Sequence, residues 1–436
     1  MIAMQRSLKA LLMPVLALLC LPARADLKID ITRGVTDPVP VAVVPFARAV
    51  PADGGLDVAA VVQSDLASSG RFRGIDRAAM PSRPTRASEV DAAAWRAQRA
   101  DYVVVGRVVA ESGSNVQLQF ELVNALTGQV LLNEAITSPQ SAVRNGAHRV
   151  ADRVFEKITG IRGAFATRIA YISVDGSPPN QRYQLLVADA DGENWRPAMQ
   201  SSQPIMSPAW SADGEWLAYV SFENRVAAVF VQRVRTGERR QVSARVGVNG
   251  APAFSPDGRK LALTLSGSTG NLDIFVLDLA TQNLVRVTDD PSIDTEPAWS
   301  PDGQTLYFTS DRGGAPQIYA APPQAGARAR RITFGATYVA RPRVSPDGKM
   351  LAVVTQDGSG FHVGVVDLAN GQVSSLSRGT LDESPSFAPN GAVLIYASRD
   401  RGQGVLATVS TDGTISTRLK SDQGEVREPV WGPFAR

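Results

Sequence analysis

The sequence is poor in the residues that build thiol and metal sites. Its 436 residues include one cysteine, Cys20, and two histidines, His148 and His362. Neither histidine has a second histidine or a cysteine at a metal-ligand spacing. We therefore expect no metal site and interpret both histidines as structural or surface residues. A single thiol also excludes an internal disulfide.

Several catalytic and cofactor-binding motifs are missing as well. The chain has no Gly-x-Ser-x-Gly nucleophile elbow and no phosphate-binding loop of the Walker type. Gly402-Gln403-Gly404 lacks the third glycine and the strand-to-helix context of a dinucleotide site, so we interpret it as a loop. Trp-Asp dipeptides, the mark of a WD40 array, are absent. These absences argue against an enzyme and against a cofactor.

The N-terminal segment has the features of a secretory signal peptide. Arg6 and Lys9 precede an apolar run at 10–21, and the small-residue triplet Ala23-Arg24-Ala25 follows. The run is near a dozen residues, whereas a helix that spans a bilayer needs about 20. We predict that residues 1–25 are removed by cleavage after Ala25.

Cleavage changes both the charge and the thiol content. The segment contains three basic residues and no acidic one, so Lys plus Arg falls from 45 to 42 and equals the 42 Asp plus Glu. A net charge of zero gives no electrostatic basis for nucleic-acid binding. Lipoprotein processing at Cys20 is an alternative, against which the bulky Leu19 argues. Since no later run is long enough to cross a membrane, we expect a periplasmic protein.

Residues 26–163 mix strand and helix periods and predict a compact α/β domain. Strands are expected at 26–32, 41–46, 102–106, 116–123 and 129–136, and helices at 56–69, 88–99 and 141–158. The second helix is placed by Ser88 and Asp91, which together resemble an N-terminal capping pattern. The third is expected to end at Gly160.

A repeat replaces this pattern after Gly163. The chain contains 37 Gly and 28 Pro, and six prolines recur every 43 to 45 residues, at 208, 252, 297, 342, 385 and 429. The fullest copies run from Pro-Ala-aromatic into Ser-Pro-Asp-Gly or a close variant, a turn sequence, and then into an apolar strand. Repeats of this length with about four short strands predict propeller blades. We interpret the Asp-Gly pairs as turns and Trp210, Trp299 and Trp431 as blade packing.

The two ends of the repeat give the number of blades. Pro429 begins a unit that contains only its first strand, and a second strand at 169–173 lacks a first. The two halves complete one blade, so residues 164–436 form a six-bladed propeller closed by the C-terminal strand. The expected fold class is α+β, with an N-terminal α/β domain followed by this propeller.

Two surfaces are candidates for binding a partner. The first is the channel mouth, formed by the three residues that end just before each repeat proline: 205–207, 249–251, 294–296, 339–341, 382–384 and 426–428. This set has five acids and two bases, and an interaction surface and ordinary polar loops explain it equally well. The second is the strand at 26–32, which can lie on its own sheet or add to the edge of a partner.

Several motifs in both domains resemble those of the TolB family of the Tol–Pal envelope system. They are PVAVVPF at 40–46, PIMSPAWS at 204–211, NGAPAFSPDG at 249–258, residues 283–288, TEP at 295–297 and LDE at 381–383. The resemblance implies a non-enzymatic protein that supports outer-membrane integrity and constriction at cell division. Its implied partners are the peptidoglycan-associated lipoprotein Pal and the inner-membrane protein TolA.

We expect Pal at the propeller mouth and TolA at the mature N-terminus, which would be a mobile strand at 26–33. The residues assigned to Pal are Met206, Asn249, Ala251, Asp294, Thr295, Glu296, Ala340, Arg341, Asp382 and Glu383. Of these, Asn249, Ala251, Thr295 and Glu296 fall in loops that the family uses. The residues assigned to TolA are Asp26, Leu27, Lys28, Ile29, Asp30, Ile31, Thr32 and Arg33. Val248 departs from the histidine of well-known members.

The resemblance decides between the two explanations of the mouth in favour of partner binding. We also expect a monomer without cofactor, metal or nucleic acid. The alternatives are a periplasmic propeller enzyme and a propeller that binds a small ligand or a cation in its channel. An enzyme requires titratable groups that converge in one pocket, and the sequence offers no candidate triad or metal cluster.

Overall fold

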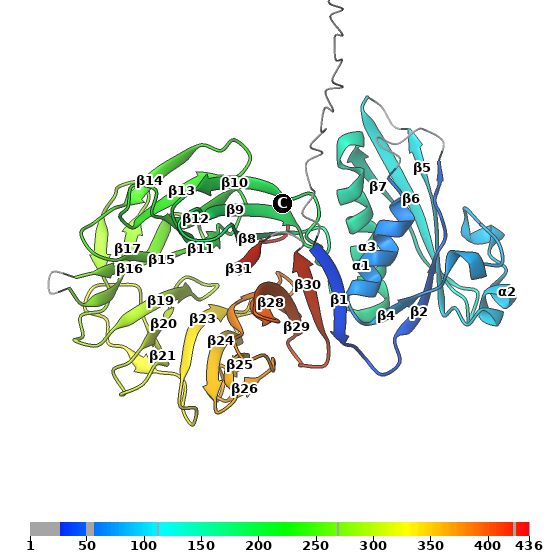
Figure 1. Cartoon of the computed structure of the whole chain (residues 1–436). Helices are drawn as coiled ribbons and strands as arrows, with labels where there is room; N and C mark the ends of the chain where they lie inside the picture. Colours follow the sequence, from blue (N-terminus) through cyan, green and yellow to red (C-terminus); the bar gives the residue numbers. More distant parts are fainter. Residues whose placement is uncertain (1–26, 49–55, 111–112, 268–269, 422–423, 436) are drawn as a thin grey trace, which may run out of the picture.

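The computed structural model describes residues 27–48, 56–110, 113–267, 270–421 and 424–435 (Figure 1). The predicted signal peptide, its cleavage site Ala25, and Asp26 lie outside these residues. The described chain forms two domains, an α/β domain and a six-bladed β-propeller, which lie side by side. The fold class expected from the sequence is therefore confirmed.

The α/β domain is built on one mixed sheet. Its strands are β2 (Val39–Val43), β3 (Ala47–Arg48), β4 (Phe72–Gly74), β5 (Tyr102–Ala110), β6 (Asn115–Asn124) and β7 (Val130–Pro139). The order is β4-β2-β5-β6-β7 with β3 beside β5; β2 runs parallel to β4 and β5, and β5, β6 and β7 are antiparallel. The helices are α1 (Val58–Ser68), α2 (Ala92–Ala97) and α3 (Val143–Thr159), with short 3-10 helices at Arg77–Ala79, Ala87–Glu89 and Gln140–Ala142.

Both faces of the central strand β2 are buried, which explains its continuous apolar run. Val41 and Val43 pack in the core that α1 and α3 share, whereas Ala42 packs with Trp95 of α2 on the other face. The predicted helix at 88–99 begins later than expected. Asp91 rather than Ser88 caps it, because the Asp91 carboxylate accepts hydrogen bonds from the first backbone N–H groups of α2.

The propeller consists of six antiparallel sheets in the described part of the chain. Blades one to three contain β8 (Arg168–Asp175), β9 (Arg182–Asp189), β10 (Arg196–Ser201) and the closing strand β31 (Glu425–Trp431); β11 (Ile205–Trp210), β12 (Trp216–Ser221), β13 (Ala228–Arg233) and β14 (Arg239–Ser243); and β15 (Asn249–Phe254), β16 (Lys260–Ser266), β17 (Leu272–Asp278) and β18 (Leu284–Arg286).

Blades four to six follow the same order, from the channel outwards. They contain β19 (Asp294–Trp299), β20 (Leu306–Ser310), β21 (Gln317–Ala321) and β22 (Arg330–Arg331); β23 (Val339–Val344), β24 (Met350–Asp357), β25 (Gly360–Asp367) and β26 (Val373–Ser375); and β27 (Glu383–Phe387), β28 (Val393–Asp400), β29 (Gln403–Ser410) and β30 (Ser416–Ser421).

The ring closes as the two ends of the repeat predict. The C-terminal strand β31 pairs antiparallel with β8, so blade one is completed from both ends of the propeller sequence. The Pro-Asp-Gly sequences form turns, in which Ser255 Oγ donates to Asp257 at 2.5 Å and Gly258 has a φ of 69°. Trp299 bonds the backbone of the neighbouring blade, since its Nε1 donates to Ala253 O at 3.1 Å.

The first described strand, β1 (Leu27–Arg33), lies on the propeller although it precedes the α/β domain in sequence (Figure 1). It pairs antiparallel with β30, from Leu27 opposite Ser421 to Arg33 opposite Ser416, with an irregularity between Ile31 and Arg33. Blade six therefore has a fifth strand. Of the two positions that the sequence left open for this segment, the structure places it on a sheet of its own chain.

None of the described helices combines the length and the apolar character that a membrane-crossing helix requires.

Candidate functional sites

A strained residue stands at the same place in every inner strand of the propeller. Directly before each repeat proline the backbone has a φ between 45° and 57°, at Ser207, Ala251, Glu296, Arg341, Ser384 and Glu428. The register with the second strand shifts around each of these residues, so each inner strand contains a β-bulge. All six residues line one narrow space on the channel axis. We call them the bulge ring.

An ion pair and hydrogen bonds link residues of the bulge ring. Glu296 accepts hydrogen bonds from Arg341 through the guanidinium Nε at 2.6 Å and through the backbone N–H at 3.1 Å. On the other side, Glu428 accepts from the backbone N–H of Ser207 at 2.6 Å. Burial raises the pKa of Glu428. The cavity that remains at the ring is small, about 30 Å³.

Three of the residues assigned to Pal are buried where they fix the loops of the mouth. Asn249 accepts from Ser243 Oγ at 2.6 Å and from the backbone N–H of Arg245 at 2.9 Å. Asp294 accepts from the guanidinium of Arg312 at 2.7 Å, and Asp382 accepts from Ser398 Oγ at 2.6 Å and from Gly379 N at 2.8 Å. Each of the three residues is no more than 1% exposed. They can act on a partner only through the loops they hold.

The other residues assigned to Pal lie nearer the surface, apart from Ala340, which is buried. Met206, Ala251, Thr295 and Glu383 are half-buried, as are the ring residues Glu296 and Arg341. The excess of acids in the sequence therefore does not produce an acidic mouth. Two of the five acids are buried in contacts of their own, and Glu296 and Glu428 are bonded within the ring.

An apolar rim, which the sequence did not predict, lies on the mouth face. The rim consists of exposed side chains on loops that lead into inner strands or that join second to third strands: Val226, Val246, Val248, Ile293 and Phe334. Val246 is 99% exposed. Between blades two and three, Val226, Val246 and Val248 border a groove of about 510 Å³, which Met206 and Phe222 also line. In the sequence, the two valines 246 and 248 on either side of a loop glycine could have indicated this rim.

The residues assigned to TolA occupy β1, except for Asp26. Besides the backbone pairing with β30, Thr32 Oγ1 donates to Ser416 O at 3.1 Å. Ile31 remains 48% exposed. The backbone pairing of β1 with β30 is a mode of attachment that another sheet edge can reproduce.

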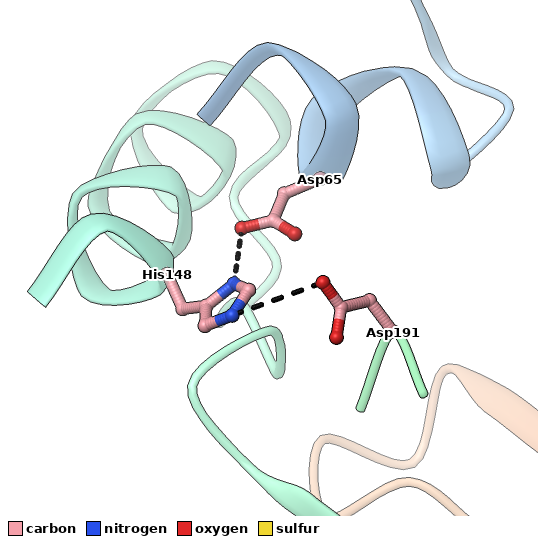
Figure 2. A group of neighbouring side chains, drawn as sticks. All are labelled: Asp65, His148 and Asp191. Carbon is pink, nitrogen blue, oxygen red and sulfur yellow. Dashed lines mark hydrogen bonds and ion pairs between the residues drawn. The ribbon is translucent and has the colours of Figure 1, made fainter. Parts of the chain in front are cut away.

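A further cluster, which the sequence does not reveal, lies between the two domains (Figure 2). It brings together Asp65 of α1, His148 of α3 and Asp191 from the turn between β9 and β10. These residues are far apart in sequence, so no spacing rule could have found them. His148 is 1% exposed, which agrees with the structural role expected for it.

Comparisons with known proteins are consistent over both domains. Residues 27–131 match the family described as the TolB amino-terminal domain, and residues 155–435 match the TolB beta propeller domain. The Tol-Pal system protein TolB of Xanthomonas oryzae pv. oryzae is 45% identical over 436 residues, covering 98% of each chain. That of Xylella fastidiosa is 44% identical over 433 residues, covering 98% of this chain and 97% of the relative.

A solved structure extends this likeness to three dimensions. The crystal structure of TolB from Acinetobacter baumannii superposes with a TM-score of 0.85 at 39% identity and covers 94% of this chain and all of that one. Since the sequence motifs, both domain matches and the fold agree, the chain belongs to the TolB family of Tol–Pal system proteins.

Proposed function

We propose that the protein is a non-enzymatic periplasmic adaptor of the Tol–Pal system. It binds Pal at the propeller mouth and TolA through the N-terminal strand, and so supports outer-membrane integrity and constriction during division. Membership of the TolB family supports the system. The observation that carries the mouth assignment is the apolar rim, because exposed apolar side chains gathered on one face are typical of a protein-binding surface.

The rim suits a protein better than a small ligand. Its exposed side chains come from loops of four blades and surround a channel that is narrow at the bulge ring. A partner that covers the mouth would bury Val246 and Val248 and insert an apolar side chain into the groove beside them. The assigned residues Met206, Ala251, Thr295 and Glu383 lie where such a partner would touch the inner edge.

The two binding surfaces are expected to be coupled. If TolA pairs with the main-chain groups of β1 that β30 engages, rather than with the outer edge of β1, the two compete and TolA binding favours the undocked strand. If Pal at the mouth alters how firmly blade six holds β1, then TolA must alter the affinity for Pal by the same factor. The affinity of TolA measured with and without saturating Pal tests this coupling.

Variants of the rim test the mouth assignment. A Val246→Asp change should weaken binding of purified Pal about tenfold or more, since it places a charge in an apolar contact. The control is Leu126→Asp, which changes an exposed apolar residue on the β6–β7 turn of the other domain. Unchanged Pal affinity in Val246→Asp would refute the assignment.

A deletion tests the N-terminal assignment. Without residues 26–33 the protein should lose TolA from a pull-down of envelope extract but retain Pal. Capture of TolA by the shortened chain would show that its site lies elsewhere.

A further inference from the structure

A buried histidine connects the two domains of the protein. His148 Nδ1 lies 2.7 Å from Asp65 Oδ2, within the α/β domain. Its other ring nitrogen, Nε2, lies 3.8 Å from Asp189 Oδ2 and 3.9 Å from Asp191 Oδ2, both in blade one of the propeller. Figure 2 shows the imidazole between the carboxylates of Asp65 and Asp191. The ring thus has a carboxylate of a different domain on each side.

This geometry favours a particular protonation state. A neutral imidazole has an N–H group on one nitrogen and a lone pair on the other. One of the two carboxylate sides would then face a lone pair, which repels it. Only the doubly protonated ring presents a donor to both sides. The only other described cation in direct contact is Arg144 of α3, which contacts Asp189 and Asp191. Three carboxylates therefore face one guanidinium and the imidazole.

We infer that His148 is a buried imidazolium that latches the α/β domain to blade one, and that this latch keeps β1 docked on the propeller. The positive charge stands between one carboxylate of α1 and two carboxylates of blade one. Loss of the charge leaves Arg144 as the only described cation in contact with these three carboxylates, which weakens the attraction between the two surfaces.

The surroundings of His148 support the charged form. Burial opposes the charge, but the carboxylates of Asp189 and Asp65 outweigh it and raise the pKa of His148 to about 10. The charged groups that face it are Asp65 from α1, Arg144 and Asp152 from α3, and Asp189 and Asp191 from blade one. Asp152 is engaged with the segment that follows α3, since it accepts from the backbone N–H groups of Phe165 and Ala166.

A bound metal ion explains the cluster less well. An ion can take only one of the two ring nitrogens, whereas carboxylates stand opposite both. Arg144 already neutralises Asp191, so a cation would have to displace a guanidinium. A second proton on His148 gives the ring a charge that attracts the carboxylates on both sides without moving any group.

The latch and β1 belong to the same interface. A cavity of about 110 Å³ lies beside the cluster, lined by Asp65 and Asp191 and by Thr417 and Leu419 of β30, the strand that holds β1. After β1 the chain returns to the end of α1, where Val35 N donates to Gly70 O at 3.5 Å. Movement of α1 away from blade one therefore pulls on the segment that anchors β1. Only the identity of TolA as the binder of β1 rests on the proposed function.

Hydrogen exchange of the purified protein tests the latch without any partner. In His148→Gln and in Asp191→Asn, amides of residues 27–33 should exchange about tenfold faster than in the wild type. The matched control is His362→Gln, which removes the other buried histidine, bonded to Asp357 at 2.9 Å within blade five, and should leave exchange in β1 unchanged. Nitrogen NMR of the wild type at pH 7 should show both ring nitrogens of His148 protonated.

The possible results separate the alternatives. Faster exchange in both cluster variants, with native exchange in the strands of the propeller core, supports the latch. A neutral His148 at pH 7, or β1 exchange that is unchanged in His148→Gln and Asp191→Asn, overturns it. Stoichiometric binding of zinc that is lost in His148→Gln overturns the ionic form in favour of a metal. None of these results depends on whether TolA binds β1, so the latch and the proposed function can fail independently.

Discussion

Arg341 of blade five holds the carboxylate of Glu296 of blade four twice, once through its side chain and once through its backbone N–H. The double contact is possible because Arg341 occupies a bulge with a φ of 57°, which turns both groups towards the preceding blade. The ion pair therefore joins neighbouring blades across the channel, where backbone pairing does not reach.

The contribution of this pair can be measured with Arg341→Met. The change removes the ion-pair partner of Glu296 and one of the cations near Glu428, so we expect a loss of about 2–3 kcal/mol in the free energy of unfolding. This is less than for a fully buried pair, because the Arg341 side chain is 34% exposed. Denaturant unfolding provides the measurement. Lys349→Met, in an exposed pair with Asp347, is the control and should change stability little; an equal loss in both would contradict the prediction.

Stability should fall in alkaline solution because of His148. Its pKa in the folded protein is about 10, above the ordinary value of 6.5, so the folded state binds the proton more tightly than the unfolded state. The stabilisation is complete below about pH 6.5 and is lost as the pH rises through about 10. Denaturant midpoints of the wild type should fall across this window, and those of His148→Gln should fall less. Parallel curves for the two proteins would show that His148 does not carry the effect.

The docking of β1 should be removable without damage to the rest of the protein. Ile29→Pro places a residue that lacks an N–H group in a strand that pairs with β30 through its main chain. We expect the amides of residues 27–33 to lose protection while the propeller strands retain it. Mass spectrometry of hydrogen exchange gives both values in one experiment. Ile29→Val preserves the N–H group and should behave as the wild type; if the proline variant also keeps its protection, main-chain pairing is not what holds β1.

Asn249 should prove to be a residue that shapes the mouth rather than one that touches a partner. Asn249→Ala leaves Ser243 and the backbone of Arg245 without their buried hydrogen-bond partner, at a cost of about 1–3 kcal/mol. The loss should appear in the free protein as a lower denaturant midpoint and as faster exchange in residues 244–248. Met206→Ala, at a half-buried position, should leave both quantities nearly unchanged. A variant Asn249→Ala of native stability would mean that the side chain does not organise the loop.

The bulges explain which part of the site the sequence could predict. The repeat of prolines at 43 to 45 residues predicted the blades and their closure, because turn chemistry and strand period are local properties. It also predicted the residues at the mouth but not their orientation. A bulge interrupts the alternation of each inner strand, so the ring residues face the channel, whereas the polar Asn249, Asp294 and Asp382, at or just before the strand starts, are buried.

The cluster around His148 is a second feature that the sequence could not predict. Asp65, His148 and Asp191 come from two domains, and only the packing of α1 and α3 against blade one brings them together. A single histidine in a sequence gives no information about such neighbours. Similarly, the period of residues 26–32 predicted a strand but not its partner. That partner is the edge strand β30, nearly 400 residues away in sequence.

The closing strand β31 also determines when the propeller can form. Because β8 obtains its inner neighbour from residues 425–431, blade one stays incomplete until nearly the whole chain has been synthesised and has reached the compartment where it folds. Contacts of such long sequence separation form late and slowly, and until then an unpaired inner edge is open to aggregation. Closure of the ring therefore depends on the last strand. A chain truncated before it would leave the ring open, with the inner edge of β8 free to pair with another strand.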